Sequence, residues 1–598
     1  MTEERDTNAD LDATGVDWDL ETLLVGDGHT SVDDILNDAD RVAADLASHK
    51  GSIGAMSAQV LAEYLTRSAY LGELLGRVGS YAGLKFAVDT QDPANGALMS
   101  QVEERSTVIE TQLVFFDLEW AALDDSLVEE LLADPCLAFA AHHLRTARRY
   151  KTHLLTEAEE VILAEKNLSG ANAWVRLFEE LQSEITAEIN GENLKLESAL
   201  SLLQAPDREV RKAAAQAVTE GLAPGLRTRA FVFNTLLSDK SIDDRLRNFD
   251  TWIASRNLSN EASDESVAAL VTAVQGRYSI PQRWYKLKAQ LLGLDRLADY
   301  DRNATVAESD LKIGWSEATE IVVDAYASFS PELGSIARAF IDNQWIDAPV
   351  RAAKRGGAFC SYTVPSHHPY LMLNWTGRRR DVLTLAHELG HGIHAYLSRQ
   401  QGVFHFSTPL TLSETASVFG ETVTFGRLLE ATKDPSERLA LLAESLEGSI
   451  ATVFRQVAMN RFEHAVHTDR RDQGEVSVDR FNELWVSTQS EMFGDTVEMS
   501  EGYETWWSYI PHFIGSPGYV YAYAYGQLLA LSVYAQYEQR GEVFVPHYIE
   551  MLSAGGSRTP EQLGTIVGVD LADPGFWEAG LDIVERQLTA TEEAVATR

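Results

Sequence analysis

Apolar residues recur at helical spacing along most of this chain, and this periodicity limits the folds that the chain can adopt. Three stretches show it clearly: residues 32–49 (VDDILNDADRVAADLASH), 58–78 (AQVLAEYLTRSAYLGELLGRV) and 436–466 (SERLALLAESLEGSIATVFRQVAMNRFEHAV). Such spacing places the apolar side chains on one face of a helix, where they can be buried together. The pattern predicts a mainly α-helical protein.

One segment has the composition of a β-sheet instead. Residues 356–374 (GGAFCSYTVPSHHPYLMLN) contain β-branched and aromatic residues, two prolines that mark turns, and no helical period. We therefore expect a small sheet here, directly before the segment that carries the chemistry. The stretch Tyr370 to Asn374 is expected to offer a free backbone edge to an extended peptide. Gly356 and Gly357 permit close approach of a second backbone, although they fit a plain turn equally well.

The length of the chain, 598 residues, exceeds what one hydrophobic core usually covers, so we expect more than one substructure. The clearest break is at Ala205–Pro206, where one helical run stops and the next begins with proline and acidic residues in its first turn. We predict a mobile acidic tail at residues 1–20, an N-terminal helical domain at residues 21–204 and a catalytic domain at residues 205–598.

Charge and cysteine content exclude several classes of function. The net charge is −40, so no nucleic-acid partner is expected, because phosphate binding needs a basic patch. Cys136 and Cys360 lie far apart in apolar surroundings, which argues against a disulfide framework. The sequence shows no signal peptide and no membrane-spanning stretch, so we expect no membrane association and a cytoplasmic location. The acidic surface fits either a salt-rich cytoplasm or the steering of basic peptides into a cleft.

The segment DVLTLAHELGHGIHAYLSRQQG, residues 381–402, is predicted to form one helix with Asp381 as its N-cap. Within it, His387 and His391 are four residues apart, about one helical turn, so both imidazoles can reach one metal ion. Glu388 lies beside them. The sequence His-Glu-x-x-His is typical of zinc hydrolases, in which the metal lowers the pKa of a bound water and the glutamate takes its proton.

A catalytic zinc ion takes three protein ligands and keeps one open position. His394 lies too far along the same helix from His387 to share one ion, and we interpret it as a polar neighbour of the site. The next predicted helix, LTLSETASVFGETVTFGRLLE, places Glu414, Ser417 and Glu421 on one stripe, and a short loop lets it fold back along the first helix. Glu414 is the expected third ligand, and Glu421 the expected acceptor for the outer N–H of a ligating histidine. Solvated surface carboxylates are the alternative.

The sequence HELGHGIH followed by SETAS and GE resembles the oligoendopeptidase F branch of the thimet-oligopeptidase-like metallopeptidases. Four further stretches look like landmarks of this family: RGGAFC at 355–360, HPYLMLNWTG at 368–377, DDRLRNFDTWIASRNLSNE at 243–261 and IPHFIGSPGYVYAYAYGQ at 510–527. The resemblance implies a two-lobed helical shell around a deep substrate channel, one zinc ion per chain, and endopeptidase action on short, unstructured peptides.

By the same resemblance, His512 and Tyr519 contact the substrate carbonyl or the oxyanion, and Tyr523 lines the same cleft. Amide hydrolysis places negative charge on the carbonyl oxygen, so such donors are needed. We expect the two tyrosines to lie one turn apart on the helix that follows His512. Some relatives place a further tyrosine three residues after this pair, where this chain has Gly526.

Together these features favour a zinc-dependent oligoendopeptidase that hydrolyses internal bonds of short peptides, with Glu388 as general base. An exopeptidase on a similar helical scaffold stays open, although no arginine or lysine near the motifs is evident for binding a terminal charge. A noncatalytic peptide-binding protein is the third hypothesis. It is disfavoured because binding alone does not require Glu388, Glu414, His512 and Tyr519 together.

Overall fold

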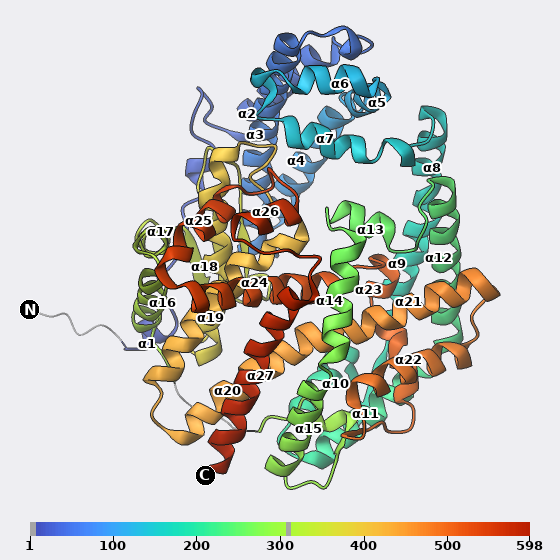
Figure 1. Ribbon diagram of the computed structural model, residues 1–598, viewed down its shortest axis with the longest axis vertical. Helices are drawn as coiled ribbons and strands as arrows, with labels where there is room; N and C mark the ends of the chain where they lie inside the picture. The colour runs from blue at the N-terminus through green and yellow to red at the C-terminus, as the bar shows by residue number, and fades with distance from the viewer. Residues whose placement is uncertain (1–6, 307–311, 598) are drawn as a thin grey trace, which may run out of the picture. The chain divides into compact units, whose positions relative to one another are not determined.

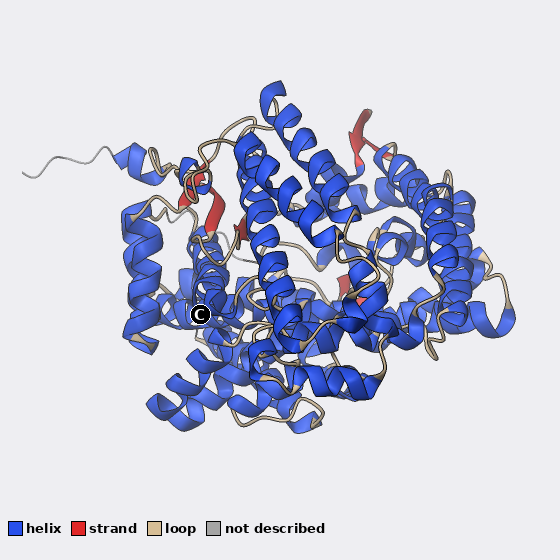
Figure 2. Ribbon diagram, turned by 90° about the horizontal axis from the view of Figure 1, so that it is seen from above, coloured by secondary structure: helices blue, strands red, loops and turns tan. Residues whose placement is uncertain are grey.

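The structure, a computed structural model, describes residues 7–306 and 312–597. Helices account for most of these residues and the strands are few and short (Figure 2), which confirms the predicted mainly α fold. Contacts within the chain divide it into two compact units, each made of three segments. Unit 1 contains residues 1–151, 310–431 and 536–569, and unit 2 contains residues 152–309, 432–535 and 570–598.

This division differs from the contiguous domains predicted from the sequence. The chain leaves unit 1 after residue 151, and the predicted boundary at residues 204–205 falls inside unit 2. Local helix breakers indicate where a helix ends, but they carry no information on which distant helices pack together. The expected arrangement of two lobes around a channel stays a prediction.

Unit 1 begins with a group of helices (blue in Figure 1) and continues with the helices and the sheet that carry the metal-binding motif. Its helices are α1 (Thr7–Leu11), α2 (Val32–Ala47), α3 (Ala58–Val88), α4 (Pro93–Thr111), α5 (Phe115–Ala122), α6 (Asp125–Leu132), α7 (Ala141–Arg149), α16 (Trp315–Phe329), α17 (Pro331–Asp342), α18 (Arg379–Ser398), α19 (Leu410–Ala431), α25 (Val545–Ser553) and α26 (Pro560–Ile566). Serine side chains begin two of them: Ser31 accepts the N–H of Asp34, and Ser57 that of Val60, as N-caps do.

The predicted acidic tail is anchored over the part that the structure describes. The side chain of Asp10 accepts hydrogen bonds from the backbone and the hydroxyl of Ser316, and the carbonyl of Val16 accepts the N–H of Ala348 at 3.0 Å. Leu20 is 7% exposed and belongs to the core of this unit. Residues 7–20 therefore pack against unit 1, whereas residues 1–6 lie outside the described residues.

The predicted sheet has three strands in the order β4-β6-β5: β4 (Ile346–Pro349), β6 (Tyr370–Trp375) and β5 (Phe359–Ser361). Strand β6 pairs in parallel with β4 and antiparallel with β5. The expectation of a free edge at Tyr370 to Asn374 is therefore wrong, because β6 is the central strand and is hydrogen-bonded on both sides. The edge strand that the same segment supplies is β5.

Unit 2 consists of helices, a short hairpin and a two-stranded ladder. Its helices are α8 (Glu157–Ser169), α9 (Ala171–Ser183), α10 (Leu196–Ser201), α11 (Arg208–Leu222), α12 (Leu226–Leu246), α13 (Ala254–Ser259), α14 (Asp264–Gly276), α15 (Ser279–Leu291), α20 (Pro435–Ser449), α21 (Arg455–Gln473), α22 (Val478–Phe493), α23 (His512–Gly515) and α27 (Pro574–Ala596). Its strands are β1 (Thr186–Ile189), β2 (Glu192–Lys195), β3 (Leu297–Ala298) and β7 (Val497–Glu498). Helix α24 (Tyr521–Arg540) contains residues of both units.

The β1–β2 hairpin was not predicted from the sequence, although the sequence contains a recognisable hairpin turn. Asn190 and Gly191 join the strands and have φ angles of +54° and +84°. An Asn-Gly pair with two positive φ angles is the preferred two-residue connection of a hairpin.

None of the helices within the described residues is long and apolar enough to cross a membrane.

Candidate metal centre

Helix α18 carries the two histidines of the motif. It begins two residues before Asp381, which lies in the first turn rather than at the predicted N-cap position. Asp381 Oδ2 accepts the backbone N–H groups of Thr376 and Arg378 at 2.8 and 3.1 Å, so the side chain still satisfies donors at the helix start. His387 and His391 follow on one face, with ring centroids 5.0 Å apart.

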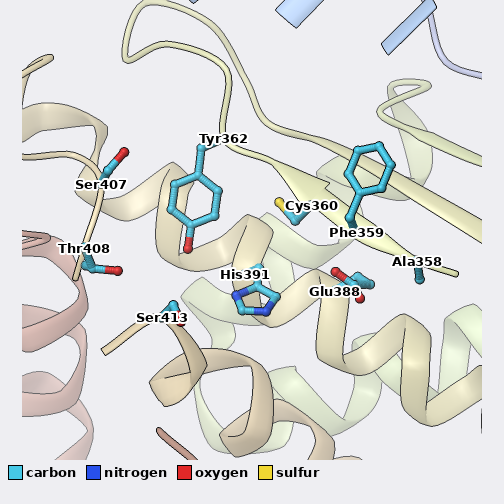
Figure 3. Close-up of a pocket in the computed structure, with 9 residues that line it drawn as sticks. All are labelled: Ala358, Phe359, Cys360, Tyr362, Glu388, His391, Ser407, Thr408 and Ser413. Carbon is cyan, nitrogen blue, oxygen red and sulfur yellow. The ribbon is translucent and has the colours of Figure 1, made fainter. Parts of the chain in front are cut away.

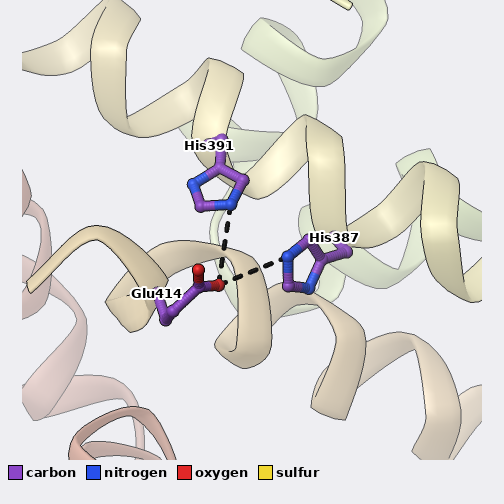
Figure 4. A group of neighbouring side chains, drawn as sticks. All are labelled: His387, His391 and Glu414. Atoms are coloured by element: carbon purple, nitrogen blue, oxygen red, sulfur yellow. Dashed lines mark ion pairs between the residues drawn. The ribbon is translucent and has the colours of Figure 1, made fainter. Parts of the chain in front are cut away.

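The predicted third ligand comes from helix α19. Glu414 Oε2 lies 3.3 Å from His387 Nε2 and 3.6 Å from His391 Nε2 (Figure 4). Potential ligand atoms of these three residues all lie within 4.8 Å of one another, and within the described residues this is the one group of at least three His, Cys, Asp or Glu side chains with such spacing. Ser417 donates its hydroxyl to the same carboxylate oxygen at 2.7 Å, which fixes the position of the Glu414 side chain.

The two helices approach closely at Gly390, the fourth residue of the motif. A Cβ atom at this position would lie 2.4 Å from the carbonyl oxygen of Ala416 and 2.5 Å from the Cα of Ser417. Only a residue without a side chain permits this backbone contact. Gly390 therefore sets the spacing between α18 and α19, and with it the distance from the histidines to Glu414.

Electrostatic interactions in this group are strong. Burial by itself would lower the pKa of His387, but Glu414 and Glu421 outweigh it and raise the pKa to about 10. Burial would raise the pKa of Glu414, yet His387 and His391 hold it at about 2. Burial lowers the pKa of His391 to about 4, so this imidazole is neutral at neutral pH. The carboxylates thus create a negative potential that favours a cation between the two Nε2 atoms.

Glu388 is 7% exposed and lies in a cavity of about 390 Å³ together with His391 (Figure 3). Burial raises the pKa of its carboxyl to about 7, against the opposing effect of His387. The cavity is lined by residues of unit 1 alone: Ala358, Phe359, Cys360, Tyr362, Glu388, His391, Ser407, Thr408 and Ser413. Because Glu388 opens onto this space beside His391, it can reach a molecule bound there.

Two further predicted residues lie around the histidines. Glu421 Oε2 is 3.2 Å from His387 Nδ1, on the side of the ring away from Glu414. His394 is 3% exposed, and burial lowers its pKa to about 3. It is not among the three residues that converge, and its role as a polar neighbour of the site stays a prediction.

The opposite wall of the cavity comes from strand β5 and the residues around it. Gly356 and Gly357 form an exposed turn before the strand, and Gly357 has a φ of +84° that favours glycine. The carbonyl of Gly357 accepts a hydrogen bond from Asn374 at 2.7 Å. Cys360 and Tyr362, which sequence reasoning did not select, both line the cavity. Burial raises the pKa of each; the carboxyl group of Glu388 adds to this at Cys360, and the Cys360 thiol and the carboxyl group of Glu414 add to it at Tyr362.

His512, Tyr519 and Tyr523 belong to unit 2 and lie together there. The rings of His512 and Tyr519 are stacked at 5.8 Å, and His512 Nε2 is 3.3 Å from the hydroxyl of Tyr523. Burial lowers the pKa of His512. Tyr519 does not lie on the following helix as predicted, because α24 begins at Tyr521. Tyr519 instead lies in the loop between α23 and α24, residues 516–520.

This loop rests on a buried carboxyl group. Glu463 of α21 is fully buried, and its Oε1 accepts the N–H of Gly518 at 2.9 Å. Burial raises the pKa of Glu463 to about 8, although Gly518 and Arg256 oppose this. Arg256 also donates to the carbonyl of Pro517 at 3.2 Å. The loop next to Tyr519 is thus held by side chains of two helices, α21 and α13.

The donor set of unit 1 fits a divalent metal ion. Two imidazole nitrogens face one carboxylate oxygen, and two histidines with one glutamate form a common ligand set of catalytic zinc sites. The cavity beside Glu388 leaves room for the open position that such a site requires.

Two family profiles match this chain. One, described as Peptidase family M3, matches residues 201–583, which is more than half of the chain and includes every predicted site residue. The other, described as Oligopeptidase F, matches residues 119–186.

Individual relatives match over nearly the whole chain. Oligopeptidase PepF of Bacillus subtilis (strain 168) is 27% identical over 560 residues, which cover 92% of this chain and 83% of PepF. Group B oligopeptidase PepB of Streptococcus agalactiae is 26% identical over 594 residues, 97% of each chain. The crystal structure of oligoendopeptidase-F from Enterococcus faecium aligns with a TM-score of 0.71 over 95% of this chain and 99% of that one, at 22% identity. The structural likeness supports the mainly α fold.

Proposed function

The chain belongs to peptidase family M3, and we propose that it is a zinc-dependent endopeptidase that hydrolyses internal bonds of short, unstructured oligopeptides. As a member of this family it is a metallopeptidase that acts on oligopeptides. The proposal adds the identity of the metal, one zinc ion per chain, the residues that hold it, the general base and the internal position of the cleaved bond.

The main support for the proposal is that one of the proposed metal ligands, His391, and the buried Glu388 line the same cavity. His387, His391 and Glu414 are the proposed ligands, and Glu388 lies in the cavity beside His391. A buried carboxyl group without a cation or a hydrogen-bond partner is costly, so its presence at this position favours a chemical role.

A zinc ion at this site would polarise the carbonyl group of the scissile bond and lower the pKa of a bound water. Glu388 takes a proton from the attacking water as the C–O bond forms, and it passes that proton to the amine as the C–N bond breaks. Glu421 accepts a hydrogen bond from the Nδ1–H group of His387, which leaves Nε2 free to bind and fixes the orientation of the ring.

Substrate binding in unit 1 is proposed to use the backbone of strand β5. Because β5 is the edge strand of its sheet and Phe359 and Cys360 line the cavity, an extended peptide could add to this edge. Main-chain pairing is independent of the substrate's side chains, which suits an enzyme for varied short peptides. From the family resemblance we further propose that His512 and Tyr519 contact the substrate carbonyl and that Tyr523 lines the same cleft.

An internally quenched peptide that is blocked at both ends tests the proposal. The wild-type protein should bind about one zinc ion and cut this peptide internally. Glu388→Gln should retain zinc and lose activity, because the amide keeps the shape of the side chain but cannot take a proton. Glu430→Gln, an exposed position on α19, is the matched control and should behave as wild type.

The outcomes separate the alternatives. Cleavage of unblocked peptides alone, with release of one or two terminal residues, would establish the exopeptidase. A protein that binds the peptides but cuts none of them, with or without zinc, would establish the noncatalytic binding protein. Full activity in Glu388→Gln would remove this residue from the reaction.

A further inference from the structure

Tyr362 has no part in the mechanism described so far, although it lies in the same cavity as Glu388 and His391. It follows strand β5 directly, so it belongs to the wall opposite helix α18. In Figure 3 its ring projects from that wall and its hydroxyl points into the space near His391 and Ser413. A tyrosine hydroxyl at this place could meet a molecule bound in the cavity.

The hydroxyl of Tyr362 makes no hydrogen bond to any residue that the structure describes. Two other tyrosines of unit 1, Tyr326 and Tyr70, differ in this respect. The hydroxyl of Tyr326 donates to the carbonyl of Ala386 at 2.7 Å, and that of Tyr70 donates to Asp38 at 2.9 Å. A hydroxyl that faces the cavity and has no partner within the protein is available to donate a hydrogen bond to a molecule bound there.

The backbone after Tyr362 is strained and firmly held. Thr363 has a φ of +58°, which a β-branched residue rarely adopts, and its hydroxyl donates to the carbonyl of His368 at 2.9 Å. Val364 is 3% exposed, and Ser366 donates to Glu73 of helix α3 at 2.6 Å. Backbone strain of this kind is often found at functional sites. Here it turns the chain sharply after β5 while Tyr362 stays directed into the cavity.

We propose that the Tyr362 hydroxyl donates a hydrogen bond to the carbonyl oxygen of the scissile peptide bond and stabilises the negative charge that develops there. This inference rests on the proposed hydrolysis. A tyrosine is protonated at neutral pH and is therefore a donor. The hydroxyl lies across the cavity from His387, His391 and Glu414. Unit 1 would then supply a hydrogen-bond donor of its own, in addition to His512 and Tyr519, which are proposed as donors in unit 2.

The variant Tyr362→Phe removes only the hydroxyl and keeps the ring that lines the cavity. We expect kcat to fall by about 10²-fold, as when one donor to an oxyanion is lost. Zinc content and KM should stay close to wild type. Tyr70→Phe is the matched control, because it removes a hydroxyl that is bonded to Asp38 outside the cavity, and its kcat should be unchanged.

A doubly blocked phosphinic pseudopeptide, which imitates the tetrahedral transition state, gives a readout other than turnover. Calorimetry should show weaker binding to Tyr362→Phe, by a factor similar to the fall in kcat/KM, and normal binding to Tyr70→Phe. Equal phosphinate affinity, an unchanged kcat, or a loss confined to KM would overturn the inference. So would loss of zinc from the variant, because the hydroxyl would then support the metal group. A wild type that binds zinc and phosphinate but cuts no peptide would refute the proposed function and with it the inference, whereas a wild type that cuts the peptide no faster than Tyr362→Phe does would refute the inference alone.

Discussion

Substitution of Gly390 by alanine should weaken metal binding although the new methyl group touches no ligand. The added Cβ would lie 2.4 Å from the carbonyl oxygen of Ala416, about 1 Å closer than ordinary van der Waals contact. The neighbouring atoms belong to the backbone of α19, so rotation of a side chain cannot relieve the clash. The helices must separate, and overpacking of this kind costs about 1–3 kcal/mol of stability.

Separation of the helices acts directly on the metal group, because α18 supplies both histidines and α19 supplies Glu414. Zinc–ligand distances tolerate changes of only about 0.2 Å. We therefore expect Gly390→Ala to lower zinc affinity by about 10–100-fold, the range seen when the support of a metal ligand is lost. Competition with a chromophoric chelator measures the affinity, and thermal unfolding of the metal-free protein measures the packing cost.

Gly426→Ala on α19 is the matched control, because a Cβ there meets nothing within 4 Å. It should leave zinc affinity unchanged and stabilise the helix by up to about 1 kcal/mol. Wild-type zinc affinity in Gly390→Ala would refute the argument that this glycine sets the spacing of the ligands.

Two other predictions concern buried or paired carboxylates. Glu421→Ala removes the acceptor that lies 3.2 Å from His387 Nδ1, and it should lower zinc affinity by about 10–100-fold. Zinc affinity equal to that of the Glu430→Gln control would show that the His387 ring needs no such partner. Burial raises the pKa of Glu463 from 4.5 to about 8, because the folded protein favours the protonated carboxyl group. The contribution of Glu463 to the free energy of unfolding is therefore fully present below about pH 4.5 and is lost as the pH rises through about 8. The stability of Glu463→Gln, measured by urea unfolding from pH 5 to 9, should therefore fall less steeply with pH than that of wild type, and parallel curves would contradict this.

The geometry of the metal group was predictable because it depends on local periodicity. Two histidines one turn apart must share a helix face, and a short loop brings Glu414 of the next helix alongside. The role of Gly390 was not predictable, because it depends on the packing of two backbones. The continuous apolar run Tyr370 to Leu373 indicates that both faces of β6 are buried, but it does not indicate that both edges are paired, because β4 and β5 come from other parts of the chain.

Tyr362 was beyond the reach of sequence patterns for a different reason. It stands directly after β5 and directly before Thr363, whose positive φ ends the extended backbone, and nothing about a threonine indicates that conformation. Tyr519 was placed on a helix because it shares a four-residue spacing with Tyr523, whereas Ser516, Pro517 and Gly518 keep the chain in a loop until Tyr521. A four-residue spacing places two residues on one face of a helix only if both residues belong to the helix, and Tyr519 lies before its start.

The interleaving of the two units has a consequence for the synthesis of the chain. Unit 1 includes residues 536–569 and unit 2 includes residues 570–598, so neither unit can be completed until these late segments have left the ribosome. Many multidomain proteins fold one domain at a time as they are made. Here helix α18 emerges long before helix α25, which packs against it, so the surface of α18 that α25 covers stays exposed to solvent and to chaperones until α25 has been made.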